Sequence, residues 1–398
     1  MAIRSIRDAQ VSGKRVLLRV DFNVPLQNGR ITDDTRIMAA LPTIDDLLDR
    51  DAAVILISHL GRPKGKPAGE FSLVPIAQRL QQFLEKPVQL VKDVGGPDAQ
   101  TASDALRGGE VLLLENVRFE PGEEQNDPEF AKRLAALGEI FVNDAFGAAH
   151  RAHASTVGIT DYLPAYAGYL MLREVEALRR LFSQPQRPFI AILGGAKVSD
   201  KIGVIENLLS RVDGILLGGG MANTFLFAQQ VEVGSSLVER ELVTEARSLL
   251  RSANGRGVEI VLPVDAVIAP TSDDQDKAGW VPISAVPADQ SILDIGPGTV
   301  RRFGEKLDGA RTIFWNGPMG VFESPAFAAG TKGVAELVAD SQAFTVVGGG
   351  DSIAAIEQMG LADRISHIST GGGASLEFVE GKTLPGLEAL DENSKRFG

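Results

Sequence analysis

Short apolar runs alternate along the whole chain with longer stretches whose apolar residues are spaced three or four apart. The runs, mostly of four to six residues, lack polar alternation, which is typical of parallel strands buried on both faces. The expected strands are residues 16–20, 53–58, 111–117, 140–144, 189–195, 214–220, 259–265, 312–317 and 345–350. Helical spacing marks residues 35–50, 128–138 and 200–212. This alternation predicts an α/β fold with two doubly wound, mostly parallel sheets.

A charged helix with one apolar stripe is expected at residues 168–182, and Pro185 and Pro188 follow it. We expect this segment to be a hinge helix, residues 169–184, that joins a domain of residues 1–168 to a domain of residues 185–384. The pattern alone also permits an ordinary surface helix of a single domain.

Composition narrows the classes of function. The chain of 398 residues fits two domains of about 200 residues each. A net charge of −12 disfavours nucleic acid or an anionic membrane as the main partner, because such binding needs a positive field. Cysteine is absent, which excludes disulfides and thiolate chemistry and is compatible with a reducing compartment. With no signal-peptide pattern and no apolar run of about 18 residues, we expect a cytoplasmic protein.

Glycine triplets stand at residues 218–220, 348–350 and 371–373, each after an apolar run. Their spacing is not periodic, so a structural glycine repeat is excluded. A strand followed by glycines gives a flexible backbone at the strand's C-terminal end, where open α/β sheets bind ligands.

Polar and basic side chains also follow the strands of the first half. They are Asp21, Asn23, Arg36, His59, Arg62, Arg118 and Arg151. Because parallel strands deliver their C-terminal ends to one edge of a sheet, we expect these side chains to meet there. Several guanidiniums in one place favour a multiply charged small anion, which they bind through paired N–H donors. Asp21 and Asn23 are expected to contact ligand hydroxyls and to orient the arginines.

The second half has neither the Rossmann fingerprint G-x-G-x-x-G nor the Walker A motif. It has the segment GGAKVSDKIG at 194–203. This segment predicts glycines that lead into a helix bearing Lys197 and Lys201. Backbone N–H groups at a helix start, together with two lysines, favour binding of phosphate oxygens. Asp351, beside a glycine turn, could hold Mg²⁺, which prefers one or two carboxylates together with phosphate oxygens. Glu323, in WNGPMGVFE, could accept hydrogen bonds from ribose hydroxyls.

Eight segments in order resemble the phosphoglycerate kinase family over essentially the whole chain. They are VLLRVDFNVP, SHLGRP, LLENVRF, VNDAFGAAHRAHAS, GGAKVSDKI, WNGPMGVFE, GGGDS and STGGGASLEF. The resemblance implies two Rossmann-like domains, a 3-phosphoglycerate site on the first and a Mg-nucleotide site for ATP or ADP on the second. It also implies that residues 385–398 return to the first domain.

The resemblance assigns roles to individual residues. The substrate residues are Asp21, Asn23, Arg36, His59, Arg62, Arg118 and Arg151. The nucleotide residues are Gly195, Ala196, Lys201, Asn316, Pro318, Glu323, Gly349, Gly350, Asp351 and Ser352, with Asp351 also serving Mg²⁺. The transferred phosphoryl group is faced by Arg36, Lys197, Gly371 and Gly372.

The implied reaction moves a phosphoryl group between 1,3-bisphosphoglycerate and ADP. In reverse the attacking atom is a carboxylate oxygen, which is already deprotonated, so no general base is expected. We expect a monomer that closes around its small-molecule substrates and excludes water. The residues alone also permit two other hypotheses. The first is a non-catalytic, two-lobed protein that binds a small anion. The second is a nicotinamide oxidoreductase, which the missing Rossmann fingerprint disfavours.

Overall fold

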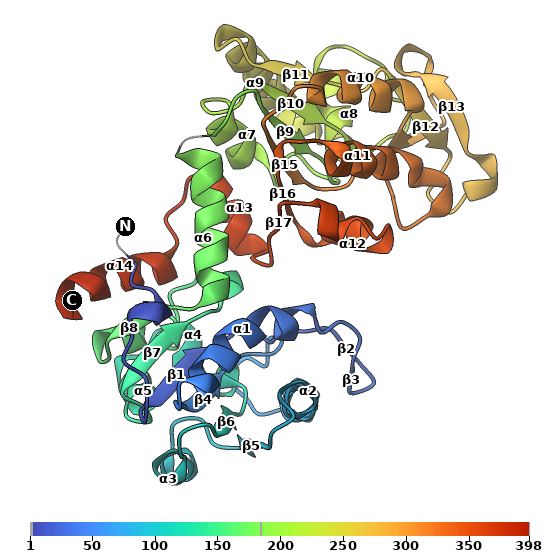
Figure 1. Cartoon of the computed structure of the whole chain (residues 1–398). Coiled ribbons are helices and arrows are strands. Elements are labelled where there is room, and N and C mark those ends of the chain that lie inside the picture. Colours follow the sequence, from blue (N-terminus) through green and yellow to red (C-terminus); the bar gives the residue numbers. More distant parts are fainter. Residues whose placement is uncertain (1–2, 184, 398) are drawn as a thin grey trace. The chain divides into compact units, whose positions relative to one another are not determined.

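The computed structural model describes residues 3–183 and 185–397, and these form two compact units. Unit 1 holds the described residues up to Glu176 together with those from Thr383 on, and unit 2 holds those between Ala177 and Lys382. Helix α6 (Tyr169–Phe182) carries the chain from unit 1 into unit 2 (Figure 1). Among the described residues, no helix combines the length and the apolar composition needed to cross a lipid bilayer.

Unit 1 contains a sheet of six parallel strands in the order β5-β6-β4-β1-β7-β8. The strands are β1 (Arg15–Arg19), β4 (Ala53–Ile57), β5 (Val88–Val91), β6 (Val111–Leu114), β7 (Ile140–Asn143) and β8 (Ala165–Ala167). From β1 the chain first builds outward through β4 and later returns to add β7 on the other side. The strand order therefore reverses at β1, and such a switch point is where open α/β sheets bind ligands.

Helices complete the layers of unit 1. They are α1 (Thr35–Asp49), α2 (Val74–Leu84), α3 (Pro97–Ala105), α4 (Pro121–Glu124), α5 (Pro128–Ala135) and α14 (Pro385–Phe397), and a hairpin of β2 (Leu26–Gln27) and β3 (Arg30–Ile31) precedes α1. Ile37 and Ile44 of α1 share one apolar core with Val16 and Leu18 of β1, since these residues repeat at helical and strand periods respectively. The C-terminal helix α14 is fixed in this unit by buried Asn393, whose Nδ2 donates to the carbonyls of residues 160 and 163.

Unit 2 contains a second parallel sheet in the order β11-β10-β9-β15-β16-β17. Its strands are β9 (Phe189–Leu193), β10 (Gly214–Leu217), β11 (Glu259–Val261), β15 (Thr312–Asn316), β16 (Phe344–Gly348) and β17 (His367–Ile368). Its helices are α7 (Ile202–Leu208), α8 (Gly219–Ala228), α9 (Val243–Gly255), α10 (Pro297–Leu307), α11 (Ala329–Asp340), α12 (Gly350–Gln358) and α13 (Gly373–Val379). Here the switch point lies between β9 and β15. The expectation of two doubly wound parallel sheets is confirmed.

One expected strand is wrong. Residues 259–265 do not form a single strand, because the chain leaves the parallel sheet after Val261 and enters a separate antiparallel sheet at Asp265. Pro263 lies between the two, and its missing N–H interrupts any continuous ladder. The antiparallel sheet has the order β13-β12-β14, with β12 (Asp265–Ala269), β13 (Gly279–Pro282) and β14 (Ser291–Ile295). The apolar runs did not predict this sheet, because β13 and β14 are only partly buried.

Candidate active site

The buried carboxylate of Asp21 lies just beyond β1, at the switch point of unit 1. Its Oδ2 accepts a hydrogen bond of 2.8 Å from Nη1 of Arg36, and its Oδ1 lies 3.9 Å from Nε2 of His59. Burial alone would raise the pKa of Asp21, but the His59 ring and the guanidiniums of Arg36 and Arg19 lower it below its ordinary value. Arg36 comes from the first turn of α1, not from a strand end, so helix and strand together build this pair.

Arg19 is a member of this cluster that we did not predict. It is the last residue of β1 and is fully buried; its Nε donates to Ser155 Oγ at 2.7 Å, and its Nη2 lies 3.1 Å from Nδ1 of His59. Because a guanidinium only donates, Nδ1 must accept, which places the ring proton on Nε2. Burial, reinforced by the neighbouring arginines, holds the pKa of His59 well below its usual value, so the ring is neutral at pH 7.

The turn after β4 ties two further expected residues to this edge. Asn23 Oδ1 accepts a hydrogen bond of 2.8 Å from the amide of Gly61, and Arg118 Nη1 donates to the Gly61 carbonyl at 2.7 Å. Gly61 has φ +60°, and a Cβ there would lie 2.4 Å from the ring of Phe71. Only glycine suits this position, so the SHLGRP turn depends on it.

A second buried carboxylate, that of Glu123, is linked to Arg19 through the hydroxyl of Ser155. Glu123, fully buried in α4, accepts hydrogen bonds from the amide and the hydroxyl of Ser155 at 2.9 and 2.6 Å, and it lies 3.6 Å from His153. Burial would raise the pKa of Glu123, but His153, Arg19 and Ser155 lower it. No sequence pattern predicted this role of Glu123, because a glutamate in a helix is usually solvated.

The two remaining arginines are exposed. Arg62 follows the Gly61 turn, and within the part of the chain that the structure describes it makes no hydrogen bond or ion pair with the cluster. Arg151 is exposed after β7, near enough to Arg118 to contribute to the lowering of its pKa. The structure therefore brings Asp21, Asn23, Arg36, His59 and Arg118 together, adds Arg19, and leaves Arg62 and Arg151 at the solvent side.

In unit 2 two loops interlock at the ends of β9 and β15. The amide of Gly194 donates to the Asn316 carbonyl at 3.0 Å, and the amide of Gly195 donates to the Pro318 carbonyl at 2.9 Å. Gly317 has φ +97°, and a Cβ there would lie 2.3 Å from the carbonyl oxygen of Gly194. Glycine is required because the two backbones meet with no room for a side chain.

The expectation that Lys197 and Lys201 lie on a helix is wrong, because both precede α7, with Lys201 at its N-cap. The amides of Val198 and Ser199 are also not free for a phosphate, since both donate to the carboxylate of Glu239, the latter at 3.1 Å. A glutamate about forty residues further along the chain thus closes this loop. Lys197, between the glycines and this anchor, is exposed.

Lys201 is buried and hydrogen-bonds Oδ1 of Asn316, whose Nδ2 donates to the Gly348 carbonyl at 2.8 Å. Burial lowers the pKa of Lys201 to about 8, although the charges of Asp200 and Asp351 oppose the shift. A buried ammonium with one amide partner can still donate to an incoming anion.

A cavity of about 670 Å³ opens beside these loops. Of the residues assigned to the nucleotide, Gly195, Ala196, Pro318, Glu323 and Asp351 line it. Gly219 and Gly220, from the glycine triplet at 218–220, also line it, as do Gly320 and Val321 of WNGPMGVFE. The lining residues outside any predicted motif are Asn223, Ser235, Leu237, Pro270, Thr271, Ser272, Ser291, Ile292 and Leu293. No local motif links these residues.

Other assigned residues support the loops around the cavity. Ser352 is buried, and its Oγ accepts a hydrogen bond of 2.6 Å from the amide of Gly317. Gly349, with φ +93°, precedes α12, which begins at Gly350. Gly371 and Gly372 lie in the turn before α13, as the glycine pattern indicated.

Asp351 is the candidate for Mg²⁺. It is exposed in the first turn of α12 and lines the cavity. Within residues 3–183 and 185–397, no group of three or more His, Cys, Asp or Glu side chains is placed to hold a metal ion. A single carboxylate fits a magnesium ion that arrives with nucleotide phosphates, because Mg²⁺ commonly takes one or two carboxylates and completes its shell with phosphate oxygens and water.

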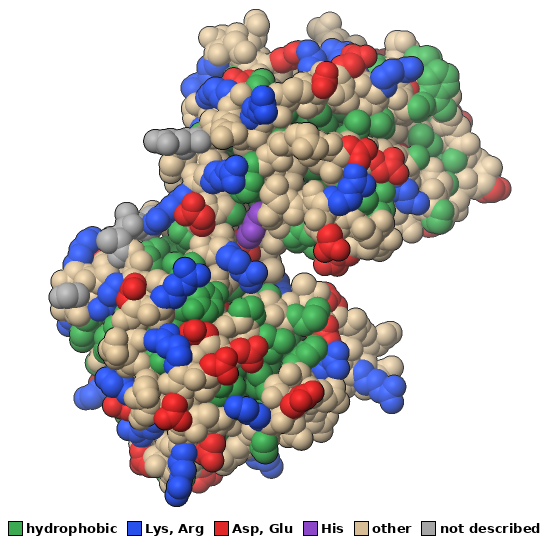
Figure 2. All heavy atoms as spheres, in the orientation of Figure 1, with side chains coloured by type: hydrophobic (Ala, Val, Ile, Leu, Met, Phe, Trp, Pro, Cys, Tyr) green, Lys and Arg blue, Asp and Glu red, His purple; other side chains and the backbone are tan. Residues whose placement is uncertain are grey.

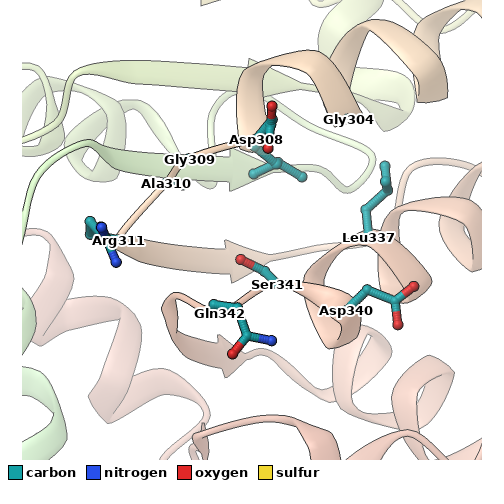
Figure 3. Close-up of a pocket in the computed structure, with 10 residues that line it drawn as sticks. Gly304, Asp308, Gly309, Ala310, Arg311, Leu337, Asp340, Ser341 and Gln342 are labelled. Carbon is teal, nitrogen blue, oxygen red and sulfur yellow. The ribbon is translucent and has the colours of Figure 1, made fainter.

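A second pocket, of about 430 Å³, lies away from these loops (Figure 3). Arg311, immediately before β15, and Asp308 and Asp340, just past or at the ends of α10 and α11, line it. It therefore sits at the N-terminal edge of the sheet, opposite the glycine loops, and contains none of the expected site residues.

Comparison with known proteins agrees with this arrangement. The family model described as phosphoglycerate kinase matches residues 6–382. The phosphoglycerate kinase of Herpetosiphon aurantiacus is 58% identical over 390 residues, covering 98% of this chain and 99% of that protein. That of Thermomicrobium roseum is 57% identical, covering 98% and 100%.

Solved structures give the same result. The phosphoglycerate kinase structure from Coxiella burnetii has a TM-score of 0.91 at 46% identity, covering 98% of this chain and 99% of that one. The structure from Pyrococcus horikoshii has a TM-score of 0.88 at 36% identity, covering 99% and 100%. With sheet topology, motifs, family model and full-length relatives in agreement, the chain belongs to the phosphoglycerate kinase family of phosphotransferase enzymes.

Proposed function

We propose that the chain catalyses reversible phosphoryl transfer between 1,3-bisphosphoglycerate and ADP, with phosphoglycerate bound in unit 1 and the Mg-nucleotide in unit 2. The observation that carries this proposal is the pairing of two different sites, one at each switch point: a buried arginine cluster in one sheet and a glycine-bounded cavity in the other. Family membership disfavours the non-catalytic anion binder and the nicotinamide oxidoreductase.

The cluster in unit 1 suits a ligand with two anionic ends and a hydroxyl. Arg36 and Arg118 provide planar N–H donors for phosphate or carboxylate oxygens. Neutral His59 offers its Nε2–H as a donor, and ionised Asp21 accepts from a hydroxyl. Arg62 and Arg151, at the solvent side, are expected to close on the bound anion.

The cavity in unit 2 suits a nucleotide. Its volume falls within the range of small-ligand pockets, about 300–1,000 Å³. Leu237, Leu293 and Val321 supply apolar surface for a base, and Glu323 supplies an acceptor for ribose hydroxyls. Lys197 and Lys201 supply positive charge for the phosphates.

Asp351 would hold Mg²⁺ together with the nucleotide phosphates, and the ion would supply charge neutralisation there. The chain's own residues do the rest by positioning. The attacking carboxylate needs no base, so Arg36, Lys197 and the amides of Gly371 and Gly372 are assigned to neutralise charge on a loose transition state.

Titration with Mg-ADP and assay of turnover with 3-phosphoglycerate and ATP test the proposal. We expect wild-type protein to bind Mg-ADP and to form acyl phosphate, and Lys197→Ala to lose most of its turnover number. Absence of Mg-ADP binding, or full turnover by the variant, would contradict the proposal.

We also infer a cytoplasmic monomer that binds small molecules. The net charge of −12 disfavours polyanionic partners, and the face drawn in Figure 2 intermixes basic and acidic side chains over each unit without a continuous basic stretch. Sedimentation at a mass near 42.3 kDa would support the monomer, and about twice that mass would contradict it.

A further inference from the structure

Asn223 carries a buried side-chain amide in unit 2. It lies in α8, is 1% exposed, and lines the 670 Å³ cavity. Neither Oδ1 nor Nδ2 has a hydrogen-bond partner within the described part of the chain. Buried side-chain amides nearly always find partners, because an unsatisfied donor or acceptor costs about 1–3 kcal/mol.

Hydrogen bonds to residues on either side of Asn223 hold this part of α8 in place. Two residues before it, the amide of Met221 donates to the Gly195 carbonyl at 3.0 Å. The next residue, Thr224, is buried and accepts a hydrogen bond of 3.1 Å from the amide of Glu239. Helix α8 therefore holds Asn223 in place at the wall of the cavity.

The cavity that Asn223 lines has an apolar component. Leu237, Ile292, Leu293 and Val321 share the lining with it. Such surface receives a flat, weakly polar ring, while the charged lining group Asp351 suits the phosphate end of a nucleotide. A side-chain amide that lines such a cavity can select for the hydrogen-bonding edge of the ring.

We propose that Asn223 hydrogen-bonds the purine base of the bound nucleotide and contributes to the preference for adenine. A carboxamide offers one acceptor and one donor side by side, which matches the amino group and the adjacent ring nitrogen of adenine. This inference rests on the proposed nucleotide site of unit 2. It adds a specificity-determining residue that the motifs did not indicate.

Base analogues and one substitution test the proposal together. The probes are ADP and the diphosphate of purine riboside, which lacks the 6-amino group, each titrated with Mg²⁺ by calorimetry. For the wild type we expect ADP to bind about 10-fold more tightly than the analogue, because the analogue leaves the amide oxygen of Asn223 unpaired. For Asn223→Leu we expect the ratio of the two affinities to fall to about 1, through loss of ADP affinity.

Further variants separate this effect from misfolding. Asn223→Asp removes the donor to the ring nitrogen but keeps the acceptor for the 6-amino group, so both diphosphates should bind more weakly while ADP remains the tighter ligand. Asn254→Leu, an exposed position at the end of α9, should leave the ratio at the wild-type value. Because Asn223→Leu replaces an unpaired buried amide by an apolar group, we expect its melting temperature without nucleotide to equal or exceed that of the wild type.

The outcomes distinguish the two proposals. If wild-type protein binds neither diphosphate, the proposed nucleotide site fails. If it binds both, but the ratio of affinities is the same in the wild type and in Asn223→Leu, the assignment of Asn223 is overturned.

Discussion

The candidate site depends on charged residues that are buried in pairs or triplets. Arg19, Asp21 and Arg36 lie within one network, and the two guanidiniums help to lower the pKa of Asp21, which stays ionised. Removing one member of such a network leaves the others unpaired, so substitutions here should have large effects. Exposed members have no such constraint.

Arg36→Ala should lower kcat by roughly 10²–10³-fold, by analogy with the loss of one preorganised donor, about 3–4 kcal/mol. We expect Arg36→Lys to restore only part of the activity, because an ammonium cannot reproduce the planar pair of donors. Steady-state kinetics with both substrates measure this. An increase in KM with unchanged kcat would show that Arg36 only binds substrate.

Lys201 should take up a proton when a nucleotide binds. Its pKa of about 8 in the free protein reflects burial, and a phosphate beside it should raise that pKa. At pH 8, binding of ADP should therefore take up about half a proton. Calorimetry in buffers of different ionisation enthalpy measures this number. Lys201→Met should abolish the uptake, and equal uptake in both proteins would contradict the assignment.

Glu239 should act through Lys197, because it holds the amides of Val198 and Ser199 on the C-terminal side of this lysine. We expect Glu239→Ala to lower kcat by about 10-fold, the effect of one or two charge-assisted hydrogen bonds, with an unchanged KM for 3-phosphoglycerate. Glu241→Ala, at an exposed neighbouring position, is the matched control. Equal kinetics for the two variants would contradict this role.

At the scale of elements, residues at the end of β7 contact the start of α6, the helix that joins the two units. Asp144 directly follows β7, and its amide donates to the Arg19 carbonyl at 2.8 Å. Its Oδ1 accepts a hydrogen bond of 3.0 Å from the amide of Met171, in the first turn of α6. Tyr169 donates from its amide to Thr43 Oγ1 at 2.9 Å. The start of α6 is thus held by side chains from α1 and from the end of β7.

Asp144→Asn should change how stability depends on pH. Burial raises the pKa of Asp144 to about 6 from an ordinary 3.8, so its contribution is fully present below about pH 4 and is lost as the pH rises through 6. An amide of the same shape removes the buried charge and keeps Oδ1 as the acceptor for the Met171 amide. We expect the variant to exceed the wild type in free energy of unfolding by roughly 2–3 kcal/mol at pH 7.5.

Urea unfolding at several pH values measures this difference. It should shrink toward zero below pH 4, where the wild-type carboxyl is protonated in both states. Asp161→Asn, with an exposed carboxylate in the same unit, should show no such pH dependence. A constant difference between wild type and Asp144→Asn at all pH values would refute the explanation.

The predicted elements agree with the structure where one local period dominates. The apolar runs at 53–58 and 312–317 became β4 and β15, and the spacing at 35–50 became α1. The helix predicted at 200–212 is shorter at both ends and spans Ile202–Leu208; before its start, Val198 and Ser199 are held by Glu239. A contact between residues about forty positions apart can override local helix propensity, and the spacing of apolar residues does not reveal it.

At the scale of the whole molecule, the two proposed sites belong to different units. Phosphoryl transfer requires the reacting atoms to approach within about 3–3.5 Å, so we propose that bound substrates draw the units together. Small-angle scattering should show a smaller radius of gyration with 3-phosphoglycerate and a non-hydrolysable Mg-ATP analogue together than with either alone. An unchanged radius would count against closure.

The amino-acid sequence by itself determined the fold class, the family and most of the strand ends that build the site. These follow from local periods and contiguous motifs, such as RVDFN after an apolar run, which need no knowledge of distant neighbours. The placement of Asp21 and Asn23 at a ligand-binding edge could be predicted for the same reason, because parallel strands present their ends together.

Only the tertiary structure decided which of these residues are buried and what each one contacts. Arg19 binds Ser155 across 136 positions, and Asn223 lines a cavity whose other walls come from distant loops. The pKa of Lys201, the neutral state of His59 and the unpaired amide of Asn223 all arise from burial beside particular neighbours. Burial and charge interaction act through space, so a linear pattern of residues does not contain them.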